Sequence, residues 1–168
     1  ALRLDHVMAL FRQWWVPAGL GSIAGGYVHY PLDDLMSVLV LESERHGCLV
    51  IGEDLGTVPP EMSHAMDDRA VYSYRVLLFA KRADGSFIAP GEYPRRAIAT
   101  ATTHDLPTLR GYWSGGDIDL RQRLSLYPNE ETRQHVADER VRDRHALLGA
   151  LADTGLKPAA ASAAPDAY

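Results

Sequence analysis

The chain has 168 residues, of which 46% are hydrophobic and 23% charged, and its formal net charge is −5. An acidic globular chain without a clustered basic surface argues against a nucleic-acid partner. No apolar stretch reaches the roughly 18 residues of a membrane span, so no membrane partner is expected. Cys48 is the single cysteine and we recognise no signal peptide, which together favour a cytoplasmic location.

Strands and helices are predicted to alternate along the chain. Residues 1–6 alternate apolar and polar side chains, which favours a strand, and residues 7–17 have helix-like spacing up to Pro17. A loop at 18–31 is followed by a helix at 32–47, a strand at 48–56 and a helix from Pro60 to about residue 70. Strands are predicted next at 72–80 and 97–105, with a turn-rich connection at 81–96 between them. The chain continues with a loop with a short helical start at 106–120 and two helices in 119–155, broken near Pro128.

This order predicts parallel βα units whose sheet is covered on both faces. A doubly wound sheet and a (β/α)8 barrel both satisfy it. The GxGxxG and Walker fingerprints are absent from the positions where nucleotide-binding folds carry them, which argues against nucleotide binding. The chain opens in mid-strand without an initiator Met, so we expect a stretch of a longer protein, and the Ala/Pro-rich residues 156–168 read as a disordered tail or linker.

Three predicted strands end in an acid, namely Asp5, Glu53 and Asp105. In barrel enzymes the carboxyl ends of the strands build the active site, and paired carboxylates are what glycosidic chemistry needs. Adjacent strands lie about 4.8 Å apart, which suits the ~5–5.5 Å carboxylate separation of retaining enzymes. We therefore expect Asp5 to be the nucleophile and Glu53 the acid and base, with Arg3 on the same strand face as Asp5 to keep that carboxylate ionised.

Other roles for these acids stay open on the pattern alone. Any acid at a strand end can instead cap the following helix. Asp54, beside Glu53, is a substrate-binding candidate that would otherwise point to the opposite side or cap the next turn. His104 and Asp105 resemble a metal-binding pair, but a metal site would need further ligands near Glu53 and His6, and HExxH is absent. We expect no metal and no organic cofactor.

The motifs that carry this chemistry also resemble a known family. The segments "LRLDHV", "VIGEDLGTVP" and "ATTHDLPTLRGYW" are similar to the catalytic-strand segments of the bacterial amylomaltases, which are 4-alpha-glucanotransferases of the α-amylase clan. The segments "WWVP", "GGYVHYPLDDLMSVLVLES" and "VYSYRVLLF" strengthen the resemblance, which runs from Ala1 to about Gly155.

The resemblance implies an α/β fold, a (β/α)8 TIM barrel of which residues 1–155 cover roughly strands 4–7. It implies that Asp5 is the nucleophile on the fourth strand, Glu53 the acid/base on the fifth and Asp105 the transition-state stabiliser on the seventh. Arg3 and His104 are then substrate-binding residues. The implied substrate is a maltodextrin, and the missing remainder of the barrel is an implied partner.

Three functions remain in competition at this level. The first is glucan transfer by double displacement, the second is α-1,4-glucan hydrolysis by the same acids, and the third is a catalytically incomplete carbohydrate-binding fragment. Exposed aromatic residues would favour sugar over water as the acceptor by stacking on glucose rings. The candidates for this stacking are Trp14, Trp15, Tyr27, Tyr30, Tyr112 and Trp113.

Overall fold

The computed structural model describes residues 1–156, so all of the tail predicted at 156–168 except Leu156 lies outside the described residues. The chain divides into two compact units. Unit 1 comprises Ala1–Arg75 and Pro94–Ala99, and unit 2 comprises Val76–Tyr93 and the chain from Thr100 onward.

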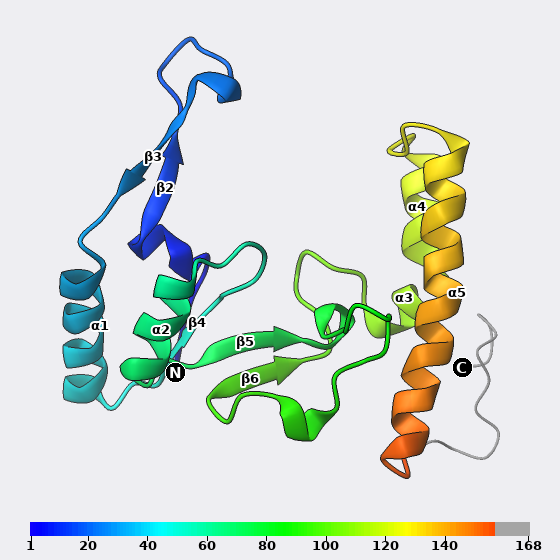
Figure 1. Cartoon of the computed structure of the whole chain (residues 1–168). Coiled ribbons are helices and arrows are strands. Elements are labelled where there is room, and N and C mark those ends of the chain that lie inside the picture. Colours follow the sequence, from blue (N-terminus) through cyan, green and yellow to red (C-terminus); the bar gives the residue numbers. More distant parts are fainter. Residues whose placement is uncertain (157–168) are drawn as a thin grey trace. The chain divides into compact units, whose positions relative to one another are not determined.

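Unit 1 is built around short parallel strands, as the sequence predicts. Strand β1 (Leu2–Leu4) pairs in parallel with β4 (Val50–Gly52), in the register Leu2 to Val50. A parallel bridge from Ile51 to Tyr72 links β4 to the chain entering β5 (Ser73–Val76). Strand β5 pairs with β6 (Ala97–Thr100), and their arrows run the same way in Figure 1. Each of the strands predicted within 1–6, 48–56, 72–80 and 97–105 is therefore confirmed in place, but each is shorter than its predicted range, and the strand predicted at 72–80 ends at Val76.

Two helices of unit 1 carry the start and stop signals that the sequence predicts. Helix α1 (Leu32–His46) has acids in its first turn and bases in its last, where they complement the helix dipole, and Gly47 ends it in the left-handed conformation. Helix α2 (Pro60–Asp68) begins at a proline, which has no N–H to leave unpaired. The helices meet the strands in one apolar core made of Val7, Met36, Val50, Met62, Met66 and Val71.

The prediction of a helix over residues 7–17 and a loop over 18–31 is wrong. Residues Val7–Leu10 form one 3-10 turn, after which β2 (Arg12–Trp15) pairs antiparallel with β3 (Gly26–His29), a further 3-10 turn (Ser22–Ala24) lying in their connection. Bulky aromatic side chains favour strands, and the glycine-rich connection lets the chain reverse. The cross-strand pair Trp14–Tyr27 then packs edge to face, with ring centroids 5.0 Å apart.

Unit 2 is mainly helical. A 3-10 turn at Leu77–Phe79 takes the place of the end of the strand predicted at 72–80, and another at Pro90–Glu92 lies in the predicted turn-rich connection at 81–96. They are followed by α3 (Leu109–Ser114), α4 (Gly116–Arg123) and α5 (Glu130–Asp153). The break between α4 and α5 falls around Pro128, as the sequence predicts, and Figure 1 shows α4 alongside α5. Among residues 1–156, no helix has the length and apolarity to cross a membrane.

Candidate active site

The acid that follows β1 is paired with an arginine of the same strand. Arg3 and Asp5 are two residues apart, so the strand alternation places both side chains on one face. Arg3 Nη2 lies 2.7 Å from Asp5 Oδ1. The Arg3 guanidinium also lies over the ring of Tyr74, 5.2 Å from its centroid. The pair is partly exposed, which leaves the carboxylate of Asp5 accessible to a reactant.

Glu53, directly after β4, is held by hydrogen bonds to the main chain. Only 4% of the residue is exposed. Its Oε2 accepts the His6 N–H at 2.8 Å, and its Oε1 accepts the Leu55 N–H at 2.8 Å. Its own N–H donates to Leu4 O, and its carbonyl accepts the Val7 N–H. The carboxyl group of Glu53 is therefore fixed in one orientation by the backbone around it.

The two acids meet across the β1–β4 pair. One carboxylate oxygen of Asp5, one of Glu53 and one ring nitrogen of His6 all lie within 4.8 Å of one another. His6 has a left-handed backbone (φ 49°), which is unusual for a residue with a side chain and reverses the chain directly after Asp5. Sequence reasoning considered His6 only as a possible metal ligand and missed this role in shaping the site.

These three residues have the donor types of a metal site, but their partners are a poor match for a cation. Arg3 already places a positive charge against Asp5, and both oxygens of Glu53 already accept main-chain N–H groups. A metal ion would have to compete with that guanidinium and those donors. The arrangement is better suited to reactions at a neutral substrate between two carboxyl groups.

Asp54 turns away from this pair. Its Oδ1 accepts the Tyr74 N–H at 2.7 Å, and its two oxygens lie 3.1 and 2.9 Å from Arg75 Nη1. Its side chain is 7% exposed. Of the two options that the sequence left for Asp54, this geometry matches the side chain that points to the opposite side; its role in substrate binding stays a prediction.

The remaining predicted site residues, His104 and Asp105, belong to unit 2. His104 Nε2 lies 3.2 Å from Asp105 Oδ2, and both side chains are exposed. The Asp105 N–H donates to Thr103 Oγ1, which fixes the turn. Asp105 also lines a cavity of about 590 Å³ together with Lys81 and Tyr112. The structure thus brings Arg3, Asp5 and Glu53 together in unit 1 and the His104–Asp105 pair in unit 2.

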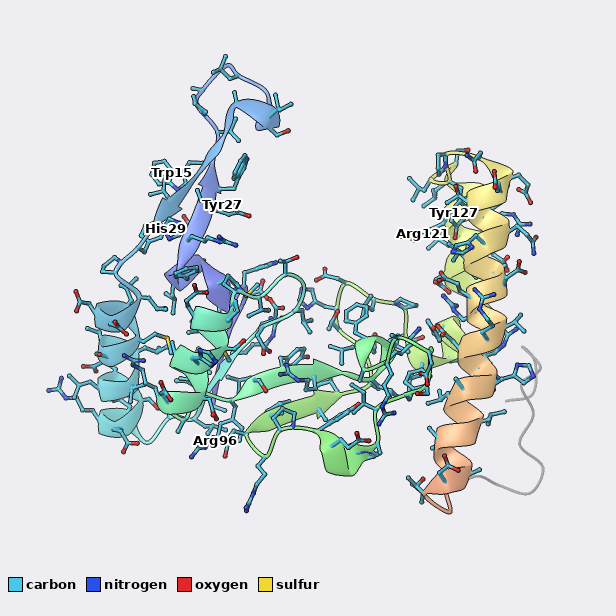
Figure 2. The ribbon with its side chains drawn as sticks, in the orientation of Figure 1. Trp15, Tyr27, His29, Arg96, Arg121 and Tyr127 are labelled. Atoms are coloured by element: carbon cyan, nitrogen blue, oxygen red, sulfur yellow. The ribbon has the colours of Figure 1, made fainter. Side chains whose placement is uncertain are left out.

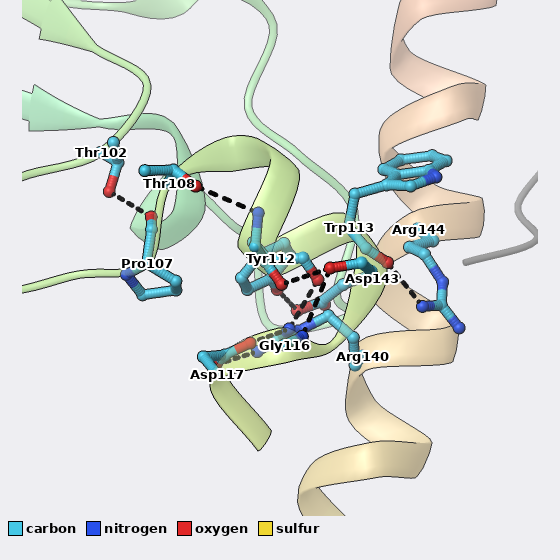
Figure 3. Close-up of polar contacts among 12 residues, drawn as sticks. Thr102, Pro107, Thr108, Tyr112, Trp113, Gly116, Asp117, Arg140, Asp143 and Arg144 are labelled. Carbon is cyan, nitrogen blue, oxygen red and sulfur yellow. Dashed lines mark hydrogen bonds and ion pairs between the residues drawn. The ribbon is translucent and has the colours of Figure 1, made fainter. Parts of the chain in front are cut away.

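A polar network holds α5 in unit 2, and sequence reasoning missed it. Arg140 forms a two-pronged ion pair with Asp117 at 2.7 and 2.8 Å, and its guanidinium stacks on the Tyr112 ring at 3.6 Å. Tyr112 donates its hydroxyl proton to Asp143 (Figure 3). Asp143 also binds Lys81 Nζ at 2.7 Å. The network joins α3, α4 and α5.

The charges of this network follow from burial and pairing. Burial opposes the ionisation of Asp117, but the hydrogen bond and charge of Arg140 outweigh it and lower the pKa of Asp117. Burial likewise opposes the charge of Arg140, and the hydrogen bond and charge of Asp117 outweigh it, so the pKa of Arg140 is raised. Burial, followed by the hydrogen bond to Asp143, raises the pKa of Tyr112.

The aromatic residues suggested for sugar stacking differ in their surroundings. Trp15 and Tyr27 lie on the β2–β3 hairpin (Figure 2), and each is more than half exposed. The indole N–H of Trp15 donates to the Tyr30 hydroxyl, which donates to Gln13 Oε1. Tyr112 is occupied by Arg140 and Asp143 instead. Stacking on glucose stays a prediction for these side chains.

Comparison with known proteins identifies the family to which the chain is similar. The family model described as 4-alpha-glucanotransferase matches residues 1–165. A 4-alpha-glucanotransferase of Haemophilus influenzae is 48% identical over 150 residues, which are 89% of this chain and 21% of that protein. One from Mycobacterium tuberculosis is 34% identical over 160 residues, covering 93% of this chain and 22% of that protein. The chain thus spans about a fifth of the length of these curated relatives.

Two solved structures of amylomaltases are also similar to the chain. The crystal structure of amylomaltase from Corynebacterium glutamicum has a TM-score of 0.84 at 32% identity, over 91% of this chain and 22% of that one. Amylomaltase from Streptococcus agalactiae in complex with acarbose has a TM-score of 0.55 at 21% identity, over 76% of this chain and 27% of that one, a likeness of fold alone. The chain belongs to the glycosyl hydrolase 77 family of 4-alpha-glucanotransferases.

Proposed function

We propose that this chain carries the central catalytic strands of a 4-alpha-glucanotransferase that transfers α-1,4-glucan segments between maltodextrins. The observation that carries the proposal is the approach of Asp5 and Glu53 carboxylate oxygens to within 4.8 Å, from two adjacent parallel strands. That separation suits a retaining mechanism, in which no water molecule has to fit between the acids and the sugar at the attack step. The family membership and the relatives' names support the same chemistry.

In the proposed reaction Asp5 attacks the anomeric carbon of the donor while Glu53 protonates the leaving glucan. A covalent glycosyl–Asp5 ester forms, and the bond to the leaving glucan breaks. Glu53 then removes the proton from the hydroxyl of an acceptor glucan, which displaces Asp5 from the same carbon. Two inversions give retention of configuration, and the reaction needs neither a metal nor an organic cofactor.

The neighbouring side chains have defined places in this scheme. Arg3 Nη2, 2.7 Å from Asp5 Oδ1, places a positive charge beside the nucleophile and orients its carboxylate. Asp105 is proposed to bind sugar hydroxyls and stabilise the transition state, with His104 as a second hydroxyl ligand. The sequence also predicts Asp54 as a substrate contact. Exposed Trp15 and Tyr27 are candidates for stacking on an acceptor sugar.

The finer architecture belongs to the same proposal. We infer that β1, β4, β5 and β6 are strands 4 to 7 of a (β/α)8 barrel within a longer cytoplasmic protein, whose remaining strands complete the sheet. The parallel β1–β4 pair, the parallel bridge to β5 and the high TM-score to an amylomaltase support this. Open parallel edges need neighbours, because unpaired strand edges expose main-chain donors and acceptors.

Incubation of the full-length protein with maltotriose tests the function. A transferase produces glucose together with oligomers longer than maltotriose, resolved by chromatography. A hydrolase produces only glucose and maltose, and an incomplete binding fragment leaves maltotriose unchanged. Either of these last two outcomes overturns the proposed transfer.

A further inference from the structure

The side chain of Asp54 continues the pairing of β4 with β5 beyond the end of the strand. Tyr72 donates its N–H to Val50 O and accepts the Gly52 N–H. The next donor in this parallel ladder is the Tyr74 N–H, which binds Asp54 Oδ1 at 2.7 Å instead of a main-chain carbonyl. The carboxylate thus replaces a backbone acceptor at the point where the two chains diverge.

Arg75 locks this replacement in place. Its Nη1 donates to both oxygens of Asp54 and also to Tyr74 O at 2.9 Å. The side chain of Asp54 is 7% exposed and that of Arg75 is 33% exposed, so the carboxylate is the buried partner. A charge-assisted hydrogen bond to a buried carboxylate is stronger and more directional than a neutral one. The Asp54–Arg75 pair is therefore a clamp between the end of β4 and β5.

The clamp acts on the residue next to it in the chain. Glu53 is held by main-chain bonds to Leu4 and Val7 on its β1 side, and Asp54 provides the matching attachment on the β5 side. Without that attachment the peptide between Glu53 and Leu55 is free to rotate, and the Leu55 N–H that binds Glu53 Oε1 moves with it. The orientation of the Glu53 carboxyl group thus depends on both sides.

We propose that Arg75 is a positioning residue for Glu53, acting through Asp54, and that Asp54 serves this clamp rather than a sugar hydroxyl. The inference rests on the proposed function, since it concerns the step in which Glu53 protonates the leaving glucan. It adds Arg75, a residue outside the predicted site, to the machinery of the reaction.

The test compares two donors in the full-length protein. Maltotriose needs a proton on its leaving oxygen, whereas α-maltosyl fluoride has a leaving group that departs with little acid assistance. In Arg75→Gln we expect kcat on maltotriose to fall by about 10- to 100-fold, as for a catalytic group misplaced by about an ångström. The KM should stay within about twofold, and the initial burst of fluoride release within about threefold of wild type, because uniform binding and attack by Asp5 are untouched.

Two companion variants separate positioning from folding. Arg75→Lys keeps a positive charge beside Asp54 and should recover part of the lost kcat. Arg69→Gln removes an arginine of the same unit whose ion pair with Asp33 is 2.8 Å long, with the Asp33 side chain 86% exposed, and should leave both donors unaffected. Unfolding temperatures of the three variants should show that Arg75→Gln is folded at the assay temperature; if it is not, Arg75→Lys alone has to show the selective loss on maltotriose.

Each other outcome has a definite meaning. Wild-type kcat on maltotriose in Arg75→Gln overturns the inference while leaving the proposed function intact. An equal loss on both donors, or a raised KM with unchanged kcat, also overturns it, because these are the signatures of a general structural role and of a sugar ligand. A wild-type protein that makes no transfer products overturns the proposed function itself, and this inference with it.

Discussion

Glu53 in unit 1 and Arg140 in unit 2 are both buried ionisable residues, but they are held in different ways. Glu53 is surrounded by main-chain N–H and C=O groups of two adjacent segments. Arg140 is held by side chains, the Asp117 carboxylate and the Tyr112 ring, and by one carbonyl, that of Tyr112. The first arrangement comes from strand register, and the second from the docking of α5.

Because the two residues are held in different ways, the two regions should tolerate different substitutions. In unit 1 the backbone positions the Glu53 carboxyl group, and Asp5 beside it is half exposed, so a change at Asp5 removes chemistry while the surrounding fold stays in place. In unit 2 the polar side chains of the network around Arg140 are structural partners of one another, so removal of one leaves a buried charge behind. Substitutions in the first region should therefore lower activity with little effect on stability, whereas substitutions in the second should lower stability first.

The largest effect expected is that of Asp5→Asn on activity. Asparagine has nearly the same shape but cannot form the glycosyl ester, so transfer from maltotriose should fall on the order of 10⁴-fold or more in the full-length protein. Thermal unfolding should be within a few degrees of wild type, because Asp5 is half exposed. Activity that survives in Asp5→Asn would remove this residue from the nucleophile position.

Asp117→Asn should be the most destabilising of the substitutions in unit 2. It leaves Arg140, whose side chain is 8% exposed, without its charged partner, at a cost of about 3 kcal/mol in the free energy of unfolding. Because the pKa of Asp117 is lowered in the folded protein, its contribution is present above its ordinary value near 3.9 and is lost as pH falls through the folded value. The variant should therefore lose less stability on acidification than wild type does.

Urea unfolding between pH 3 and 7 measures both effects. Glu42→Gln is the matched control, since its ion pair with Arg45 is exposed, and it should change stability by less than about 0.5 kcal/mol. Equal unfolding midpoints for Asp117→Asn and Glu42→Gln at neutral pH would contradict the structural role given to the buried pair.

Gly52→Ala tests the backbone packing next to Glu53. A methyl group at this position would lie 2.9 Å from Met66 Cε and 2.9 Å from Val7 Cγ2. Overpacking of this kind costs about 1–3 kcal/mol, and here it also pushes on the end of β4. Gly26→Ala, which meets no atom within 4 Å, is the control. Unfolding midpoints should fall for Gly52→Ala alone, and an unchanged midpoint would show that Met66 and Val7 can yield.

Tyr112→Phe should have the smallest effect of the series, about 1 kcal/mol at pH 8, for the loss of one hydrogen bond whose acceptor keeps Lys81. The pKa of Tyr112 is raised in the folded protein, so its contribution is complete below its ordinary value near 10 and is lost as pH rises through the folded value. The difference between wild type and variant should shrink from pH 8 to pH 10.5 in urea unfolding. A constant difference would show that the pKa of Tyr112 is the same in the folded and the unfolded protein.

Much of the site could be predicted because its signals are local. The acids at the ends of β1 and β4 follow strands that the alternation of side chains already indicates, and parallel pairing of those strands brings Asp5 and Glu53 together. The hairpin at residues 12–29 could not be predicted in the same way. Its aromatic run has apolar side chains on both faces, so helical spacing and strand spacing fitted it equally well.

The sequence was enough to predict the order of the elements outside the hairpin at residues 12–29, the acids at the strand ends, the residues that begin and end α1, and the proline that begins α2. The partners of Asp54, which are the Tyr74 N–H and Arg75 of β5, came from the tertiary structure alone. It alone also decided the docking of α5 through Arg140 and Asp143. The reason is range: capping and alternation depend on neighbours within a few residues, whereas hydrogen bonds between residues 20 to 60 apart depend on how the elements pack.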